Sequence, residues 1–193
     1  MTTDTDELPS TCSGGGPIIG LPAEVATEWR GTSPPVGAVV PPGWTWGSAG
    51  GPVCDYDRAC DHIQDRVRTP YGGFGWVEVG GNIGLVFECE LGTAWLATDV
   101  GGVVVRRAED ASRDEARALV DAVPKEKWTA WSKRLVLTDG RLFLFDSAFE
   151  GAADPGAIAS DDGAVVASPG PGTYAIATAT DDDERDYMRL TRV

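Results

Sequence analysis

Two hydrophobic runs joined by an Asp-Gly pair occupy residues 134–146, which read RLVLTDGRLFLFD. Runs rich in Val, Leu and Phe are typical of β-strands, and Asp-Gly between two such runs is a strong signal for a tight hairpin turn. The stretch therefore predicts an antiparallel hairpin made of strands 134–138 and 141–146, with Asp139-Gly140 at its turn.

Similar runs continue on both sides of this stretch and predict a mainly antiparallel protein. Gly80-Gly81-Asn82 is a hairpin signal, and Val103-Val104-Val105 indicates a strand buried on both faces. The further strands are expected at 16–21, 76–79, 83–90, 93–98, 103–107, 164–167, 173–179 and 187–193. Of these, 76–79 pairs with 83–90 and 173–179 pairs with 187–193.

One helix is clearly marked, at about residues 112–123. Ser112 and Glu115 have the spacing of a capping box, the apolar side chains that follow recur at helical spacing, and Pro124 ends the pattern. Two shorter helices are expected nearer the N-terminus, at 23–29 after Pro22 and at about 57–63.

Together these elements predict an α+β fold: mainly antiparallel β-sheet, one clear helix and one or two short N-terminal helices. We expect residues 1–10 to form a flexible acidic arm and residues 11–193 to form a single domain. Residues 32–43 carry four prolines and are expected to be a loop.

The charge balance excludes several classes of partner. The 193 residues include 30 acidic and 16 basic side chains, a formal net charge of −14. Nucleic-acid binding and attachment to anionic membranes both depend on Lys and Arg, so we expect neither. The first residues are acidic and polar, and no run of 18 apolar residues occurs, so we expect no signal peptide, no membrane span and a cytoplasmic location.

Catalytic and metal-binding patterns are scarce. His62 is the single histidine and is expected to be exposed or structural, and the four cysteines, at positions 12, 54, 60 and 89, contain no C-x-x-C pair. We expect free thiols, with Cys89 a small hydrophobic residue of a strand. No phosphate-binding or dinucleotide-binding glycine motif is present. We therefore expect no catalytic site, no metal and no cofactor.

Two acidic blocks are candidate partner-binding sites. Asp181-Asp182-Asp183-Glu184 lies at the predicted tip of the last hairpin, where it either is simply solvated or docks a basic partner. Asp55-Tyr56-Asp57 either offers an exposed polar and aromatic contact or has a structural role, in which Asp55 caps the short helix and Tyr56 packs on the core. For this block the structural role is favoured.

Three tryptophans lie in the first quarter of the chain: Trp29, Trp44 and Trp46. Each could either contact a partner or pack in the core. Tryptophan is enriched among the residues that dominate binding energy at interfaces. It is also a large core residue, and the chain contains seven tryptophans. Core packing is the favoured interpretation.

The order of several short motifs resembles the immunity protein 21 family of bacterial polymorphic toxin systems. The matching pieces, which span residues 12–193, are Ser13-Gly14-Gly15-Gly16-Pro17-Ile18-Ile19, Leu21-Pro22, Trp29-Arg30-Gly31, Asp55-Tyr56-Asp57-Arg58-Ala59-Cys60, Gly80-Gly81, Leu144-Phe145-Asp146-Ser147-Ala148, Pro171-Gly172-Thr173-Tyr174 and Leu190-Thr191-Arg192-Val193. The connection formed by residues 32–52 looks longer than the family's.

The resemblance implies a non-catalytic, cytoplasmic protein that binds and neutralises a cognate toxin domain by occlusion. If that toxin is a basic nuclease-type domain, the net charge of −14 suits an inhibitor that covers its phosphate-binding groove. Two alternatives stay open from the residues alone: an acidic adaptor domain for another basic protein, and a small carboxylate-dependent hydrolase. A concave site with two carboxylates would favour the hydrolase.

Overall fold

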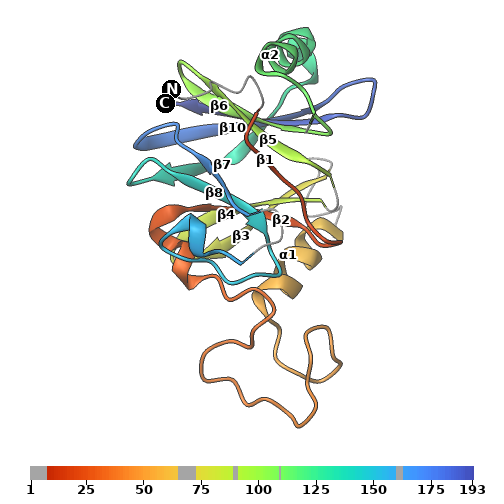
Figure 1. Cartoon of the computed structure of the whole chain (residues 1–193), viewed down its shortest axis with the longest axis vertical. Coiled ribbons are helices and arrows are strands. Elements are labelled where there is room, and N and C mark those ends of the chain that lie inside the picture. Colours follow the sequence, from red (N-terminus) through yellow and green to blue (C-terminus); the bar gives the residue numbers. More distant parts are fainter. Residues whose placement is uncertain (1–7, 65–72, 89–90, 109, 160–162) are drawn as a thin grey trace.

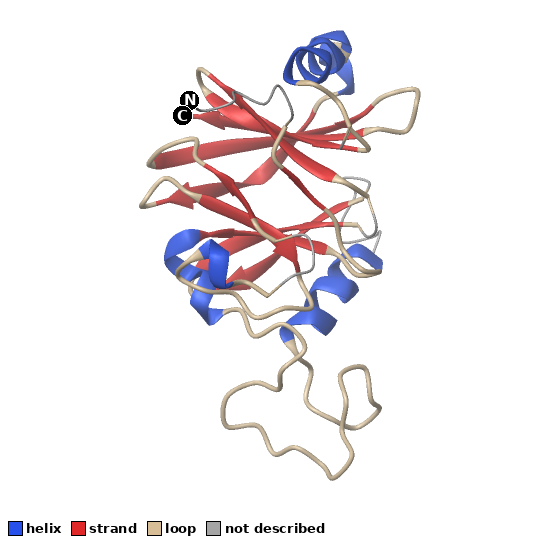
Figure 2. Ribbon diagram, in the orientation of Figure 1, coloured by secondary structure: helices blue, strands red, loops and turns tan. Residues whose placement is uncertain are grey.

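The chain folds into two antiparallel sheets that pack face to face (Figures 1 and 2). The computed structural model describes residues 8–64, 73–88, 91–108, 110–159 and 163–193. One sheet has six strands in the order β1-β5-β6-β11-β10-β7, and the other has five in the order β3-β4-β2-β8-β9. The predicted α+β class, mainly antiparallel, is confirmed.

The six-stranded sheet is formed by β1 (Ser10–Thr11), β5 (Thr93–Thr98), β6 (Gly101–Arg106), β7 (Thr129–Leu137), β10 (Gly172–Thr180) and β11 (Asp186–Arg192). The five-stranded sheet is formed by β2 (Ile18–Pro22), β3 (Phe74–Val79), β4 (Asn82–Phe87), β8 (Leu142–Asp146) and β9 (Val165–Ala167). The helices are α1 (Asp55–Gln64) and α2 (Arg113–Ala122), with short 3₁₀ helices η1 (Ala23–Glu28), η2 (Lys125–Lys127) and η3 (Pro155–Ala157).

Both sheets bury apolar side chains on both faces, which produces three core clusters. The central cluster lies between the sheets and contains Phe87 and Leu144 of one sheet with Val104 and Leu190 of the other. A second cluster joins the outer face of the five-stranded sheet to η1 and α1. A third joins the outer face of the six-stranded sheet to α2. The molecule is thus a layered sandwich with a helix or helices on each outside face.

The predicted helix at 112–123 is confirmed as α2, together with its capping box. Ser112 Oγ accepts a hydrogen bond from Glu115 N (3.3 Å), and Glu115 Oε2 accepts one from Ser112 N (2.9 Å). Ala116 and Val120 pack on the sheet beside Val103 and Val105. Since Val104 faces the central cluster, the valine triplet is buried on both faces as predicted.

Two of the three predicted hairpins are confirmed. β3 pairs with β4 across Gly80-Gly81, whose φ angles of 56° and 77° suit a two-residue turn that requires left-handed conformations. β10 pairs with β11 along the whole length of β11, from Tyr174 opposite Arg192 to Thr180 opposite Asp186.

The prediction of a hairpin at Asp139-Gly140 is wrong, because the strands before and after this turn, β7 and β8, belong to different sheets. Leu135 of β7 lies opposite Tyr174 of β10, whereas Leu144 of β8 lies between β2 and β9. The physical reason is burial: all five residues of β8 are buried, so this strand needs a partner on each edge and apolar cover on each face. The Asp-Gly turn carries the chain from one sheet to the other.

At the N-terminus, the described residues join the sandwich from Leu8 onward. Leu8 is buried in the cluster under α2, and Ser10 pairs with Ala94 as part of β1. The last residues of the predicted acidic arm therefore belong to the folded domain, while residues 1–7 lie outside the described part. Cys89, predicted to be a core residue, also lies outside it.

Candidate partner-binding surfaces

The acidic tip of the β10–β11 hairpin is an ordered turn built around Asp181. The Asp181 carboxylate accepts hydrogen bonds from Asp183 N (2.9 Å), Arg185 N (2.8 Å), Arg185 Nη1 (3.2 Å) and the Tyr187 hydroxyl (2.7 Å). Burial alone would raise the pKa of Asp181, but these hydrogen bonds favour its charged form and lower it. The pKa of Tyr187 is raised, by burial and by its hydrogen bond to Asp181.

The other three carboxylates of the tip also have cationic partners. Asp183 pairs with Arg185 at 2.7 Å, Asp182 pairs with Lys127 of η2, and Glu184 lies 3.8 Å from Arg107. Three cations therefore face four carboxylates. Asp182, with its side chain 95% exposed, is the tip residue most accessible to a partner.

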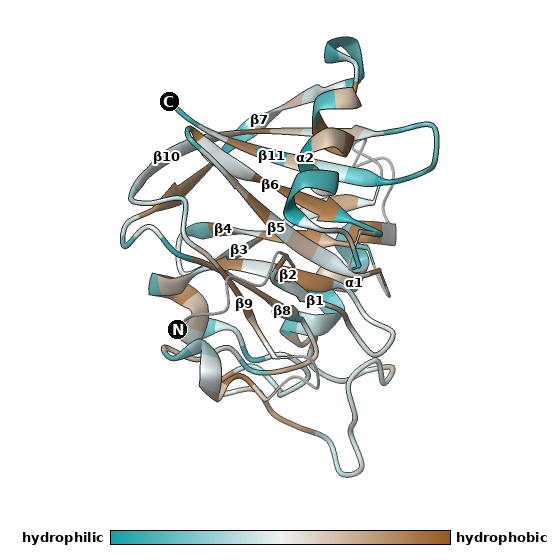
Figure 3. Cartoon of the chain, turned by 45° about the horizontal axis from the view of Figure 1, so that its top comes forward, coloured by the Kyte–Doolittle hydropathy of each residue, from teal (hydrophilic) through white to brown (hydrophobic). Residues whose placement is uncertain are grey.

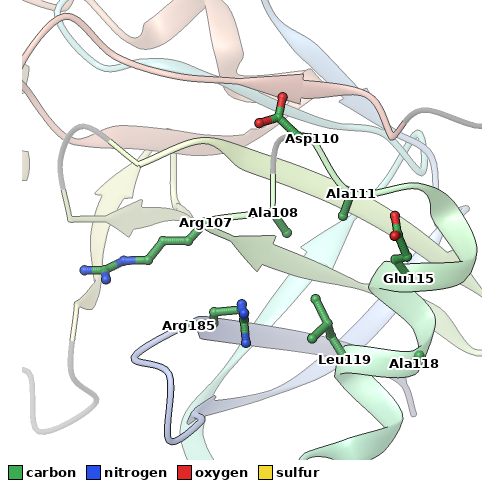
Figure 4. Close-up of a pocket in the computed structure, with 8 residues that line it drawn as sticks. All are labelled: Arg107, Ala108, Asp110, Ala111, Glu115, Ala118, Leu119 and Arg185. Atoms are coloured by element: carbon green, nitrogen blue, oxygen red, sulfur yellow. The ribbon is translucent and has the colours of Figure 1, made fainter.

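An open depression of about 650 Å³ lies beside this tip (Figure 4). Alanines and Leu119 supply its apolar surface, and arginines and carboxylates supply its charges. The lining residues are Arg107, Ala108, Asp110, Ala111, Glu115, Ala118, Leu119 and Arg185. An apolar centre with a charged rim is a common composition for a protein interface.

The depression contains two carboxylates, Asp110 and Glu115, and a concave site with two carboxylates is what the hydrolase alternative requires. The Glu115 side chain is bonded to Ser112 Oγ and Ser112 N, and these hydrogen bonds lower its pKa. A general acid in glycoside hydrolysis needs the opposite shift, a raised pKa. Among the described residues, no group of three or more His, Cys, Asp or Glu side chains could hold a metal ion. Glu115 is therefore engaged in the cap of α2 and does not suit the role of a general acid.

The second candidate block, Asp55-Tyr56-Asp57, forms the first turn of α1. Asp55 Oδ2 accepts a hydrogen bond from Arg30 N (2.8 Å), and Asp55 Oδ1 pairs with Arg58 (2.7 Å). Asp57 Oδ2 accepts hydrogen bonds from Cys54 N and Cys54 Sγ, both at 3.1 Å. The expectation that Asp55 caps the helix is wrong, because the helix begins at Asp55 and the carboxylate bonds to a distant backbone amide instead.

Tyr56 packs on the core, as predicted, and links α1 to the loop before it. Its ring is buried and lies against Gly16, where an added Cβ would be only 2.5 Å away. The Trp46 ring meets Tyr56 edge to face, with the ring centroids 5.0 Å apart. The Tyr56 amide donates to Gly31 O at 3.0 Å, which brings the two ends of the intervening segment together.

Two of the three tryptophans depart from the expectation of core packing. Trp29 is buried, and its Nε1 donates to Ser147 O at 2.9 Å, so the prediction holds for that residue. Trp44 is only half-buried, and Trp46 is 51% exposed. Both lie in the segment between η1 and α1, which projects from the sandwich at the bottom of Figure 1.

The structure does not bring the two predicted acidic blocks together. The hairpin tip lies at the six-stranded sheet near α2, whereas Asp55-Tyr56-Asp57 lies on α1 against the five-stranded sheet, at the opposite side of the sandwich (Figure 1). The prolines of the projecting segment predict only a loop. The signal that could have marked it is the absence of any charged residue from position 31 to position 53.

Comparison with known proteins gives one informative match. A family model described as immunity protein 21 matches residues 11–186, nearly the whole chain, and supports a role in toxin immunity. Neither a curated protein nor a solved structure matches. No helix in the described part of the chain is long and apolar enough to cross a membrane. Because the family model matches residues 11–186 of the 193, the chain belongs to the immunity protein 21 family.

Proposed function

We propose that this protein is a non-catalytic antidote that binds a cognate toxin domain in the cytoplasm and neutralises it by covering its active surface. The match to the immunity protein 21 family over residues 11–186 carries this proposal. The composition of the depression beside α2 supports binding, because it combines an apolar centre with a charged rim.

The charge of the chain suggests the chemistry of the partner. A net charge of −14 accelerates association with a basic protein, and nuclease-type domains are basic because they bind phosphates. Each carboxylate of the hairpin tip already faces a cation, so we assign the attraction to the summed charge, with Asp182 the tip residue best placed for a direct contact. Neither nucleic acid nor membrane is a proposed partner.

The test is a growth rescue with a physical readout. The toxic domain encoded beside this gene is expressed with and without this protein, surviving colonies are counted, and the purified pair is analysed by size-exclusion chromatography. Rescue with a stable stoichiometric complex is the expected result. Rescue without a complex would overturn occlusion, and failure of a folded protein to rescue would overturn the toxin assignment.

Salt dependence tests the electrostatic part separately. Association measured from low to high ionic strength should slow steeply as salt screens the attraction between the acidic antidote and a basic toxin. An association rate that does not change with salt would overturn the basic partner, even if the complex is stable.

A further inference from the structure

The segment between η1 and α1 is uncharged in a strongly charged protein. Residues 31–53 read GTSPPVGAVVPPGWTWGSAGGPV, without a single Asp, Glu, Lys, Arg or His, whereas 24% of the whole chain is Asp, Glu, Lys or Arg. In Figure 3 this loop lacks the deep teal that marks the charged hairpin tip. We call residues 31–53 the neutral loop.

The neutral loop presents apolar side chains to solvent and contributes none to the cores. Val36 is 87% exposed and Val39 is 90% exposed, and Val40, Trp46 and Val53 are exposed as well. No member of the three buried core clusters lies between positions 31 and 53. Exposed apolar groups gathered in one segment mark interaction sites, and long loops without regular structure are usually functional when they are ordered.

The neutral loop is ordered by four successive tight turns. In each, an amide donates to a carbonyl three residues earlier: Ala38 to Pro35, Trp44 to Pro41, Ser48 to Thr45 and Gly51 to Ser48. The third position of each turn is a glycine, and the φ angles of Gly37, Gly43, Gly47 and Gly50 lie between 73° and 79°. A type II turn requires a φ near +80° at this position, which glycine adopts without strain.

The base of the neutral loop is held by the Asp55-Tyr56-Asp57 block. Asp55 bonds to Arg30 N and Tyr56 N bonds to Gly31 O, so both ends leave the sandwich at one place. The Trp46 ring rests on Tyr56, and the Trp44 ring lies against Gly51, where an added Cβ would fall 2.0 Å from it. Side chains presented by a pre-ordered loop lose little conformational entropy on binding.

We propose that the neutral loop inserts into an apolar cleft of the toxin domain and supplies the salt-insensitive part of the affinity. This rests on the proposed function, since it places the toxin's contact on a particular segment. A second copy of the chain fits poorly, because each copy carries −14 and the like charges repel. A neutral partner surface suits a segment without charges, and an exposed tryptophan is the residue type most enriched among binding hot spots.

The first test places a carboxylate on the loop. Val39→Asp and, separately, Val36→Asp are compared with Val100→Asp, a matched control in the β5–β6 turn that is 57% exposed and changes the net charge equally. Affinity for the cognate toxin is measured by isothermal titration calorimetry, and the association and dissociation rates are measured by surface plasmon resonance. Burial of an unpaired charge should weaken the two loop variants by at least about tenfold, mainly through faster dissociation. Val100→Asp should bind like the wild type.

The second test changes the order of the loop without removing a contact side chain. Gly43→Ala adds a methyl group that meets nothing within 4 Å, but it forces alanine to a φ of 74°, whereas the control Gly14→Ala also meets nothing and has no such φ. The left-handed strain predicts weaker binding by about five- to thirtyfold for Gly43→Ala. The control should bind normally.

The outcomes separate this inference from the proposed function. If the wild-type protein forms no complex with the toxin, the proposed function fails. If the complex forms and the Val36→Asp and Val39→Asp variants both bind as tightly as the wild type, the neutral loop is not the contact and the inference fails. If the free protein self-associates and Val39→Asp abolishes that association, the loop is an interface between copies and the inference is also overturned.

Discussion

Replacing Asp181 should destabilise the protein far more than replacing its neighbour Asp182. The Asp181 carboxylate accepts four hydrogen bonds within the hairpin tip, two from backbone amides, one from Arg185 Nη1 and one from the buried Tyr187 hydroxyl. Asp182 has an exposed side chain and one ion pair, to Lys127. The two aspartates are adjacent in sequence and identical in chemistry, so they form a matched pair.

The size of the effect follows from the donors that Asp181→Ala would strand. Water can replace the carboxylate at the exposed Asp183 amide, but it reaches the Tyr187 hydroxyl and the Arg185 amide less easily. Hydrogen bonds to a charged group contribute about 1.5–3 kcal/mol each, so the loss of these two should lower the free energy of unfolding by about 3 kcal/mol. Asp182→Ala should change it by less than about 0.5 kcal/mol, as expected of an exposed ion pair.

The assay is urea unfolding followed by tryptophan fluorescence, repeated from pH 7 to pH 3. Because the folded-state pKa of Asp181 is lowered below the ordinary aspartate value of 3.8, its carboxylate stabilises the folded state above that value. The difference between wild type and Asp181→Ala should hold from pH 7 to about pH 5 and shrink as the pH falls through 3.8 toward the folded-state pKa. Equal stability of the two alanine variants at pH 7, or a difference that grows in acid, would refute the reasoning.

Two further predictions concern the capping box and a buried thiol. Ser112→Ala removes the acceptor for Glu115 N and should lower the free energy of unfolding by about 1 kcal/mol, a fall of about 2–4 °C in Tm, whereas the exposed Ser132→Ala in β7 should leave Tm unchanged. An equal Tm for both variants would contradict this. Burial raises the pKa of Cys54 to about 11, so about one molecule in a thousand carries its thiolate at pH 8. Alkylation of Cys54, followed by peptide mass spectrometry, should accelerate up to about pH 11, and a midpoint near pH 8.5 would argue against the buried site.

Elements whose signals are local were predictable from the sequence. Ser112 and Glu115 are three residues apart, and the glycines of the β3–β4 turn adjoin the strands that they connect, so no distant residue is needed to specify either feature. The same holds for the β10–β11 hairpin, whose partners are close in sequence. In each case, the chemistry that fixes the conformation lies within the segment itself.

The predictions of a hairpin at Asp139-Gly140 and of a helix cap at Asp55 are wrong because residues distant in sequence determine both features. Asp139-Gly140 permits a sharp turn, but whether the flanking strands pair with each other depends on β10, β2 and β9, which compete for their edges. Asp55 is predicted to cap a helix, but the helix begins at Asp55 itself, and its carboxylate accepts hydrogen bonds from the Arg30 amide, 25 residues earlier, and from Arg58. The spacing of residues in a sequence indicates which local conformations are possible. It does not indicate which of several distant residues a side chain or strand will contact.

In the proposed arrangement, stability and toxin recognition are carried by different residues of this protein. The three core clusters draw on both sheets, η1, α1 and α2, and their buried members all lie outside the neutral loop. The two ends of that loop meet at Gly31 and Tyr56, so its length can change without shifting the register of β2 or the start of α1. Since the entropy of closing a loop rises only slowly with its length, a long insertion here costs the sandwich little. The neutral loop of this protein can therefore change in length or sequence while the packed layers, and the Asp55 contact with the Arg30 backbone, hold its base in place.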